Sequence, residues 1–521
     1  MSRGGKPSER LAAACLCALV AAIPLGAPTS AGGTTLRVSY LGPARLFGPV
    51  TLRANATAGP NRIVAVTFLL DGRPLGSDTT APYTLDLDGG LLERGVHPLR
   101  VVAVDSLGRR KSSRPVDVRT GGPTRRMLTA SPQRNLRRAL AALRRGGVTV
   151  RLRPGRYVLE KVTIGSGANL LGAGPRTVIT APSGDPYFGI LAAKGRNIRI
   201  SDLTLDGLGP GAGEGAAVAV FDGSRNVRLQ RLHIKRVRKT GVVVWGAHSD
   251  ISIQDSLIEG DGTARAGVRA LGSDESRTVS VIRTRVRGFR DFGIVFSQRK
   301  FRRRAAGLHA VALDNDVSAI VDPARSVCRS EPETSGCGTN ESGIWSGGVE
   351  AAIVGNRIRR TGWTGIETVG SSTRTLVASN DVRSTRTGIY LEHSTNQSLI
   401  ARNLISNVRT GINVEWTYDG VGSKDNTFAF NRVVSAARSG LFADVGADGN
   451  RIVGNVFVGG ARPAVILQGS SNNVVSANHG CSSNSGPLVR EQTARWDDGT
   501  PARPRANLIV GNKSTRSCPA R

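Results

Sequence analysis

A short phrase centred on asparagine recurs along the second half of the chain at nearly constant spacing. It reads IVGNRI around Asn356 and returns at steps of 24, 23, 28, 24 and 23 residues, at Asn380, Asn403, Asn431, Asn455 and Asn478. Earlier, with less regular steps, the same slot holds Asp202, Arg231, Asp255, Thr284 and Asn315. A unit this short cannot bury an apolar face alone, so the copies are expected to stack.

A second phrase, glycine followed by an aliphatic residue, comes after each copy of the first. It occurs at Gly241, Gly267, Gly293, Gly343, Gly365, Gly388, Gly411 and Gly440. Two phrases in fixed register predict turns of about 23 residues with two or more short strands each. Strands of adjacent turns would run parallel about 4.8 Å apart, and the asparagines would form a ladder at a corner. The repeat therefore predicts a parallel β-helix of ten or more turns.

The amino-acid composition favours thin, turn-rich β layers. Aromatic residues make up only 4% of the 521 residues, and glycine occurs 65 times. The repeats resemble the right-handed β-helix superfamily of pectate-lyase-like proteins over about residues 131–518. A helix is expected to cap the N-terminal end, with Ser131 as N-cap, Pro132 at the first helical position and Leu136, Leu140 and Leu143 on one face.

Residues 35–120 are expected to form a small β-sandwich. Apolar residues alternate from Val64 to Leu70 and end at the turn pair Asp71-Gly72. The stretches FLLDGRPLGSDTTAPYTLDL and GVHPLRVVAVDSLG resemble bacterial Ig-like modules, which implies a spacer or adhesion role without catalytic residues. The expected organisation is a signal peptide at 1–31, the Ig-like domain at 35–120, a linker at 121–130 and the β-helix at 131–521.

The first residues are typical of an export signal. Arg3, Lys6 and Arg10 precede an apolar stretch, and Thr29-Ser30-Ala31 is a small-residue cleavage site. The mature protein is therefore expected to be secreted or at the cell surface, monomeric, without a membrane span. Four cysteines remain, and oxidising conditions favour disulfides, the simplest of three connectivities pairing Cys328 with Cys337 and Cys481 with Cys518.

The chain is strongly basic, with a formal net charge of +32, which falls to about +30 after removal of the signal. This charge favours an anionic partner such as an acidic polysaccharide, whereas export argues against nucleic acid. Lysine supplies only 9 of the 71 basic residues. A general preference for arginine in the composition therefore explains the net charge as well as an anionic partner does. The charge alone assigns no substrate.

Strand alternation divides the side chains that follow each glycine into inward and outward sets. The inward set is small or apolar: Val244, Ala270, Phe296, Ser346, Thr368, Leu391, Val414 and Ala443. The first outward column comprises Val243, Arg269, Val295, Trp345, Glu367, Tyr390, Asn413 and Phe442. The second outward column comprises Trp245, Leu271, Ser297, Gly347, Val369, Glu392, Glu415 and Asp444.

Acids and aromatics gather in the later turns of these columns, as a sugar-binding site requires. The predicted catalytic residues are Glu392, Glu415 and Asp444, with Glu367 at the edge. The predicted substrate-binding residues are Trp345, Tyr390, His393, Asn413, Trp416 and Arg269. Glu415 has an acid above and below it, so it should hold a proton most readily and act as general acid, with Glu392 or Asp444 as base or nucleophile.

Two alternatives remain at this point. Ca²⁺ could bridge the carboxylates to a uronate although no cofactor is required, or the face could be solvated with acids there by chance. The catalytic motifs of alginate epimerases, polygalacturonases and pectate lyases are absent from this sequence. We therefore expect a secreted protein that acts on a polysaccharide as a lyase or hydrolase, with a non-catalytic envelope-binding or adhesion protein as the alternative.

Overall fold

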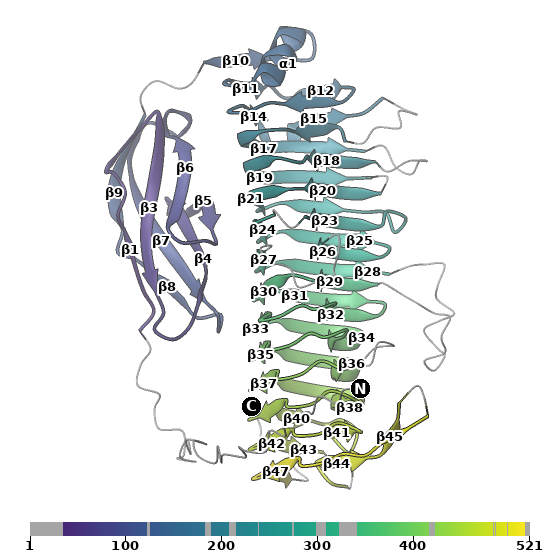
Figure 1. Cartoon of the computed structure of the whole chain (residues 1–521). Helices are drawn as coiled ribbons and strands as arrows, with labels where there is room; N and C mark the ends of the chain where they lie inside the picture. The colour runs from purple at the N-terminus through teal and green to yellow at the C-terminus, as the bar shows by residue number, and fades with distance from the viewer. Residues whose placement is uncertain are drawn as a thin grey trace, which may run out of the picture.

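The computed structural model describes residues 35–121, 126–182, 189–207, 215–237, 239–273, 276–298, 309–321, 341–415, 422–482, 484, 486–496 and 499–515. They form a small β-sandwich followed by a β-solenoid of about 12 turns (Figure 1). The predicted order, an Ig-like sandwich before a parallel β-helix of ten or more turns, is confirmed. The signal peptide lies outside the described residues.

The sandwich packs two sheets around one apolar core that includes Leu52, Phe68 and Leu99. Its smaller sheet consists of β1 (Arg37–Tyr40), β3 (Pro49–Thr57) and β6 (Tyr83–Asp88). Its larger sheet consists of β2 (Arg45–Phe47), β9 (Val116–Gly121), β7 (Gly95–Asp105), β4 (Ile63–Leu70), β5 (Arg73–Asp78) and β8 (Arg110–Ser112). A short 3-10 turn, η1 (Gly89–Leu91), follows β6.

Each solenoid turn contributes parallel strands to three faces. The first face consists of β13 (Val162–Ile164), β16 (Leu191–Ala193), β18 (Ala216–Val220), β20 (Thr240–Gly246), β23 (Ala266–Gly272), β26 (Phe292–Gln298), β29 (Ser342–Gly347), β32 (Thr364–Val369), the later halves of β34 (Asp381–Leu391), β36 (Leu404–Val414) and β38 (Arg432–Ala443), then β41 (Val465–Gln468) and β44 (Val489–Gln492).

The second face consists of β10 (Met127–Ala130), β11 (Thr149–Leu152), β14 (Asn169–Leu171), the first halves of β17 (Arg196–Asp206) and β19 (Ser224–Lys235), then β21 (His248–Gln254), β24 (Thr278–Ile282), β27 (His309–Leu313), β30 (Glu350–Val354), β33 (Leu376–Ala378), β35 (Leu399–Ala401), β37 (Thr427–Ala429), β39 (Arg451–Val453), β42 (Val474–Ser476) and β47 (Leu508–Val510).

The third face consists of β12 (Gly155–Val158), β15 (Thr177–Thr180), the later halves of β17 and β19, β22 (Leu257–Glu259), β25 (Arg285–Phe289), β28 (Asp316–Ile320), β31 (Arg357–Thr361), the first halves of β34, β36 and β38, β40 (Val456–Val458), β43 (His479–Cys481) and β48 (Lys513–Thr515). The turn η2 (Gly174–Arg176) precedes β15, and β45 (Ala494–Arg495) pairs with β46 (Pro501–Ala502) near the C-terminus.

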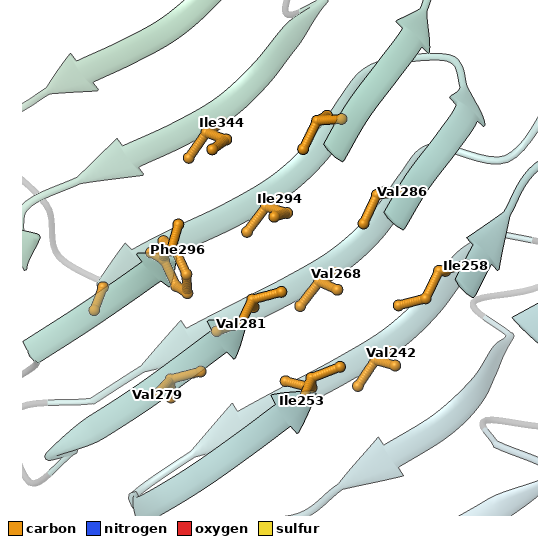
Figure 2. Packing of buried hydrophobic residues seen from close by; sticks show 14 of the residues in the cluster. Val242, Ile253, Ile258, Val268, Val279, Val281, Val286, Ile294, Phe296 and Ile344 are labelled. Carbon is orange, nitrogen blue, oxygen red and sulfur yellow. The ribbon is translucent and has the colours of Figure 1, made fainter. Parts of the chain in front are cut away.

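The aliphatic residue after each repeated glycine points into the solenoid, as predicted. Val242, Val268, Ile294 and Ile344 align in successive turns and are fully buried. Figure 2 shows this line beside Val279, Val281 and Ile253 of the second face and Ile258 and Val286 of the third. The three faces therefore share one continuous apolar core.

The repeated glycines are required by the close approach of adjacent turns. A Cβ on Gly365 would lie 2.7 Å from the carbonyl oxygen of Gly388, and one on Gly388 would lie 2.5 Å from that of Gly411. Atoms of the next backbone cannot move aside without disturbing the strand pairing. The glycine column thus permits the spacing that places the outward side chains of the first face.

The predicted asparagine ladder is present between the second and third faces. The side-chain Nδ2 of Asn380 donates to Oδ1 of Asn403 at 3.0 Å, and Asn403 donates to Asn431 at 2.9 Å. The same bond links Asn315 to Asn356 and continues to Asn512 at the C-terminal end. Each amide in the run also donates to a backbone carbonyl, so the corner is bonded along the solenoid axis.

The capping helix is present but begins later than predicted. Helix α1 spans Leu136–Arg145, and its N-cap is Asn135, with φ of 62° and no side-chain capping bond. Ser131, the predicted N-cap, instead exchanges backbone hydrogen bonds with Arg134 and forms a tight turn. Because β10 already pairs with β11, the solenoid starts within the residues that we expected to be a linker.

The Ig-like domain packs along the second face of the solenoid (Figure 1). Val64, Ala65 and Val104 form one buried apolar cluster with residues such as Leu313 and Val354. Polar contacts cross the same boundary, for example from Arg62 to Glu350 at 2.8 Å. Strand β4 is therefore buried on both sides, which explains its nearly continuous apolar sequence.

Candidate functional site

The first outward column forms as the alternation predicts. Strand pairing aligns Val243 with Arg269, Val295, Trp345, Glu367, Tyr390, Asn413 and Phe442 in consecutive turns of the first face. The pairings extend the column to Ile466 and Arg490, which the sequence analysis did not include. Arg269 is four pairings from Tyr390, so the column does not bring it to the acidic residues.

Three acids, Glu392, Glu415 and Asp444, lie one turn apart just beyond the ends of β34, β36 and β38; we call them the carboxylate row. Their backbone N–H groups each donate, at 2.9 Å, to a carbonyl of the preceding turn, on Thr368, Leu391 and Val414 respectively. Adjacent turns are about 4.8 Å apart, so their carboxyl groups are electrostatic neighbours. The row continues the second outward column.

Glu367 is more buried than the acids of the carboxylate row, with 7% of its surface exposed. Its Oε2 accepts a 2.5 Å hydrogen bond from Ser342 Oγ, and its Oε1 accepts one of 3.1 Å from Trp345 Nε1. Burial, assisted by the charge of Glu392, raises the pKa of Glu367 to about 7, although both hydrogen bonds oppose the rise. Ser342 was not predicted; it occupies the position before Gly343, outside the residues assigned to columns.

Glu415 lies between two neutral donors. Tyr390 donates its hydroxyl to Oε2, and Asn413 donates Nδ2 to Oε1 at 2.5 Å. Burial raises the pKa of Glu415, and the charges of Asp444 and Glu392 raise it further, whereas the two donors lower it. Charge crowding was the predicted cause, but burial is the larger one. Burial also raises the pKa of Tyr390 well above its ordinary value, with the charge of Glu415 next.

Glu392 is partly exposed and pairs with the residue that follows it. His393 Nε2 lies 3.0 Å from Glu392 Oε1. His393 and Ser394 have φ of 50° and 63°, so the chain turns sharply at the end of β34 and folds the imidazole back to the carboxylate. The structure thus places His393 in contact with Glu392.

Asp444 is hydrogen-bonded to a row of glutamine side chains that the sequence did not predict. Gln468 Nε2 donates to Asp444 Oδ1 at 3.0 Å, and Gln492 Nε2 donates to Gln468 Oε1 at 2.5 Å. Gln468 and Gln492 are register neighbours on β41 and β44. The glycine phrase is broken there by Ala464, which is why the column was not followed past Asp444.

The predicted ring contacts are only partly accessible. Tyr390 and Asn413 are each 8% exposed and are engaged with Glu415. Trp345 packs edge-on against Phe292, with ring centroids 6.2 Å apart. Several predicted residues lie outside the described part of the chain: Trp416, Cys328, Cys337 and Cys518. Cys481 is buried and disulfide-bonded. The pairing of Cys481 with Cys518 stays a prediction.

The best-formed hollows in the described part of the chain lie away from the carboxylate row. One lies between the Ig-like domain and the second face, and another lies beside α1 at the N-terminal end of the solenoid. Among the residues that the structure describes, none of the helices is long and apolar enough to cross a membrane.

The pairing pattern defines the class of protein: a β-helix solenoid that follows a small Ig-like β-sandwich. More particularly, the family model "Bacterial Ig domain" matches residues 42–101, and the model "Periplasmic copper-binding protein (NosD)" matches residues 335–512. The second match covers the turns that carry the carboxylate row. No curated protein matches the chain in sequence.

The solved structures that show some likeness to this chain include carbohydrate-active enzymes. The family 28 exopolygalacturonase of Yersinia enterocolitica is 11% identical, with a TM-score of 0.47, covering 92% of this chain and 99% of that one. The mannuronan C-5 epimerase AlgE6 A-module of Azotobacter vinelandii is 14% identical, with a TM-score of 0.42, covering 72% and 92%. Pectate lyase Pel9A is 12% identical, with a TM-score of 0.40, covering 61% and 78%. At these identities the likeness is one of fold.

The described residues do not fit copper. Copper sites use imidazole, thiolate or thioether ligands, and within the described ranges no three histidine, cysteine, aspartate or glutamate side chains gather to hold a metal ion. The matched segment has His393 and His479 on separate turns. The carboxylate row instead offers oxygen atoms that are already hydrogen-bonded within the chain.

Proposed function

We propose that this protein is exported and acts on a polysaccharide, as a glycoside hydrolase or lyase, through the carboxylate row. The observation that carries the proposal is the environment of Glu415. Burial raises the pKa of its carboxyl group, Tyr390 and Asn413 hold that group in place, and Glu392 of the neighbouring turn contacts His393. A carboxyl group with a raised pKa, close to a second carboxylate, is suited to act as a general acid.

In this proposal Glu415 holds the proton that is given to the glycosidic oxygen, and Tyr390 and Asn413 orient its carboxyl group. Glu392 acts as base or nucleophile, and His393 positions it or takes part in proton transfer. Adjacent turns give a separation near the ~5 Å of retaining enzymes, while Glu392 and Asp444, two turns apart, approach the inverting range of about 9 Å. Trp345, Trp416 and Arg269 would contact flanking sugars.

Export and substrate charge are supported by other features. The N-terminal residues have the pattern of a signal peptide, and the matched NosD description is of a periplasmic protein. A net charge near +30 on the mature chain favours an anionic polysaccharide such as a polyuronate. An extracytoplasmic location would also favour the two predicted disulfides, Cys328–Cys337 and Cys481–Cys518.

One observation favours a second candidate, a non-catalytic envelope-binding or adhesion protein. The carboxyl oxygens of Glu367 and Glu415 are both occupied by donors of the same chain. Such a network can hold a binding surface rigid without transferring protons. The description of the family matched at residues 335–512 is likewise that of a binding protein.

The Glu415→Gln variant tests the enzyme against the binder. The amide oxygen can accept from Asn413, and the amide nitrogen can donate to the Tyr390 hydroxyl, which rotates to accept. The fold and the glycan affinity should therefore be kept while turnover falls by about 100-fold or more, because the transferable proton is lost. Turnover and binding of the same glycan are measured on both proteins.

The matched control is Glu160→Gln, at an exposed acid far from the row. This variant should retain wild-type turnover. Full activity in Glu415→Gln would rule out the assigned acid, and glycan binding by the wild type without turnover would establish the binder.

A further inference from the structure

A cavity of about 310 Å³ lies between the Ig-like domain and the second face of the solenoid; we call it the seam cavity. One wall is formed by β3, β6 and neighbouring residues of the Ig-like domain, and the other by β14, β17 and β19. Ligand sites commonly occupy such places between domains, at volumes of about 300–1,000 Å³. It lies on a different face from the carboxylate row, so it is a separate site.

One arginine of the seam cavity has a buried nitrogen without a hydrogen-bond partner in the described part of the chain. Arg199 lines the cavity, and its Nε is buried without a hydrogen-bond partner among the described residues. The nearest acid on the same strand, Asp202, is already held by Arg231 through two bonds of 2.6 and 2.8 Å. Burial lowers the pKa of Arg199 to about 10, and the neighbouring charge of Arg231 contributes. A guanidinium in this state is suited to an oxyanion that brings two acceptors.

The second arginine of the cavity is already committed to the domain boundary. Arg228 donates to the backbone oxygen of Asp86 at 2.8 Å. The Asp86 carboxylate accepts from Thr51 of its own domain at 2.5 Å and from Asn226 of the solenoid at 3.5 Å, so this acid is engaged at the boundary. Arg199 is therefore the group that an anionic ligand would neutralise.

The rest of the lining is suited to a sugar ring. Asn197 and Asn226 are joined by a 2.8 Å bond and present amide groups at one side of the cavity. Val50, Leu75 and Leu87 supply apolar surface. Amides that bind hydroxyl groups, apolar surface for the face of a pyranose and one cation together match a uronic acid.

We propose that the seam cavity binds a uronate monosaccharide, or the uronate end of a chain, with the sugar carboxylate on Arg199 and the ring hydroxyls on Asn197 and Asn226. The ligand would contact both domains and strengthen their docking. The proposal stands independently of the carboxylate row, because it requires no catalysis.

The test uses the full mature chain and isothermal titration with D-glucuronate and D-galacturonate, with D-glucose and inorganic sulfate as comparison ligands. At least one uronate should bind, and glucose should not. The Arg199→Met variant, which removes the charge but keeps most of the side-chain volume, should weaken uronate binding about tenfold to a hundredfold. Arg196→Met is the matched control, at an exposed position of the same strand that does not line the cavity.

Thermal unfolding supplies a second readout with a definite sign. Uronate should raise the Tm of the wild type and leave that of Arg199→Met unchanged. Without ligand, the Tm of Arg199→Met should lie close to that of the wild type, because, among the described residues, the buried Nε of Arg199 makes no hydrogen bond that the variant would lose. A ligand-induced rise in the Tm of Arg199→Met equal to that of the wild type would overturn the proposal.

A second variant keeps the test decisive if Arg199→Met fails to fold. Asn197→Asp places a carboxylate beside Arg199 at an exposed position whose φ of 55° aspartate tolerates. It should also weaken uronate binding. Absence of uronate binding by the wild type, equal binding by the variants, or sulfate binding as tight as that of uronate would each overturn the proposal.

Discussion

The acids of the first face differ mainly in what surrounds each carboxyl group. Glu367 accepts from Ser342 and Trp345, Glu415 accepts from Tyr390 and Asn413, and Glu392 contacts His393. Alternation after each glycine predicts the column of every one of these acids. It does not predict their partners, because the partners are set by side-chain rotamers and by residues one turn away.

Glu367 makes stability depend on pH in a definite direction. Its pKa is about 7 in the folded protein against an ordinary value of 4.5, so the folded state binds the proton more tightly. The resulting stabilisation is complete below about pH 4.5 and is lost as the pH rises through about 7. The gap between the two values corresponds to about 3 kcal/mol.

The Glu367→Gln variant should remove this dependence. The amide can accept from Trp345 and donate to Ser342 Oγ, as the protonated acid does, and it stays neutral at every pH. Its free energy of unfolding, measured by urea denaturation, should match the wild type near about pH 4 and exceed it by about 3 kcal/mol near about pH 8.5. An unchanged slope would contradict the protonated state of Glu367; Glu491→Gln, at an exposed acid, serves as the control.

The asparagine ladder could be predicted from the sequence, but a second asparagine series and the start of helix α1 could not. The spacing of the phrase around Asn356 and Asn380 indicates the ladder directly. A second series, in which backbone N–H groups of Asn426 and Asn450 donate to the next asparagine side chain at 2.9 Å, lies outside that phrase and was missed. Helix α1 was placed too early because Ser131 and Pro132 have the usual N-terminal pattern but form a separate turn.

The Asn403→Ala variant measures what the ladder contributes. Asn403 is buried, accepts two bonds from Asn380 and donates to Val377 and Asn431. Its loss leaves buried donors and a carbonyl unpaired, so the free energy of unfolding should fall by about 3 kcal/mol or more. Asn484→Ala, at an exposed asparagine with one bond to Gly460, should change it by less than about 0.5 kcal/mol. Equal effects would mean that the ladder contributes little.

In the whole molecule, the Ig-like domain and the carboxylate row occupy two different faces of the solenoid. The Ig-like domain lies along the second face (Figure 1), which it contacts through the cluster of Val64, Ala65 and Val104. The first face carries the carboxylate row. The repeat and the Ig-like stretches were sufficient to predict both domains. Their docking was not predicted, because apolar residues such as Val354 that point outward from the solenoid resemble core residues until the faces are assigned.

We propose that the first face breaks down a polysaccharide with Glu392 and Glu415. The most direct measurement incubates the mature wild type and a Glu392→Ala/Glu415→Ala double variant with polyuronates and neutral glycans, and follows both unsaturated products and new reducing ends. We expect products from the wild type on at least one glycan and none from the double variant. Equal product formation by both proteins, or retention of the glycan by the wild type without any product, would contradict it.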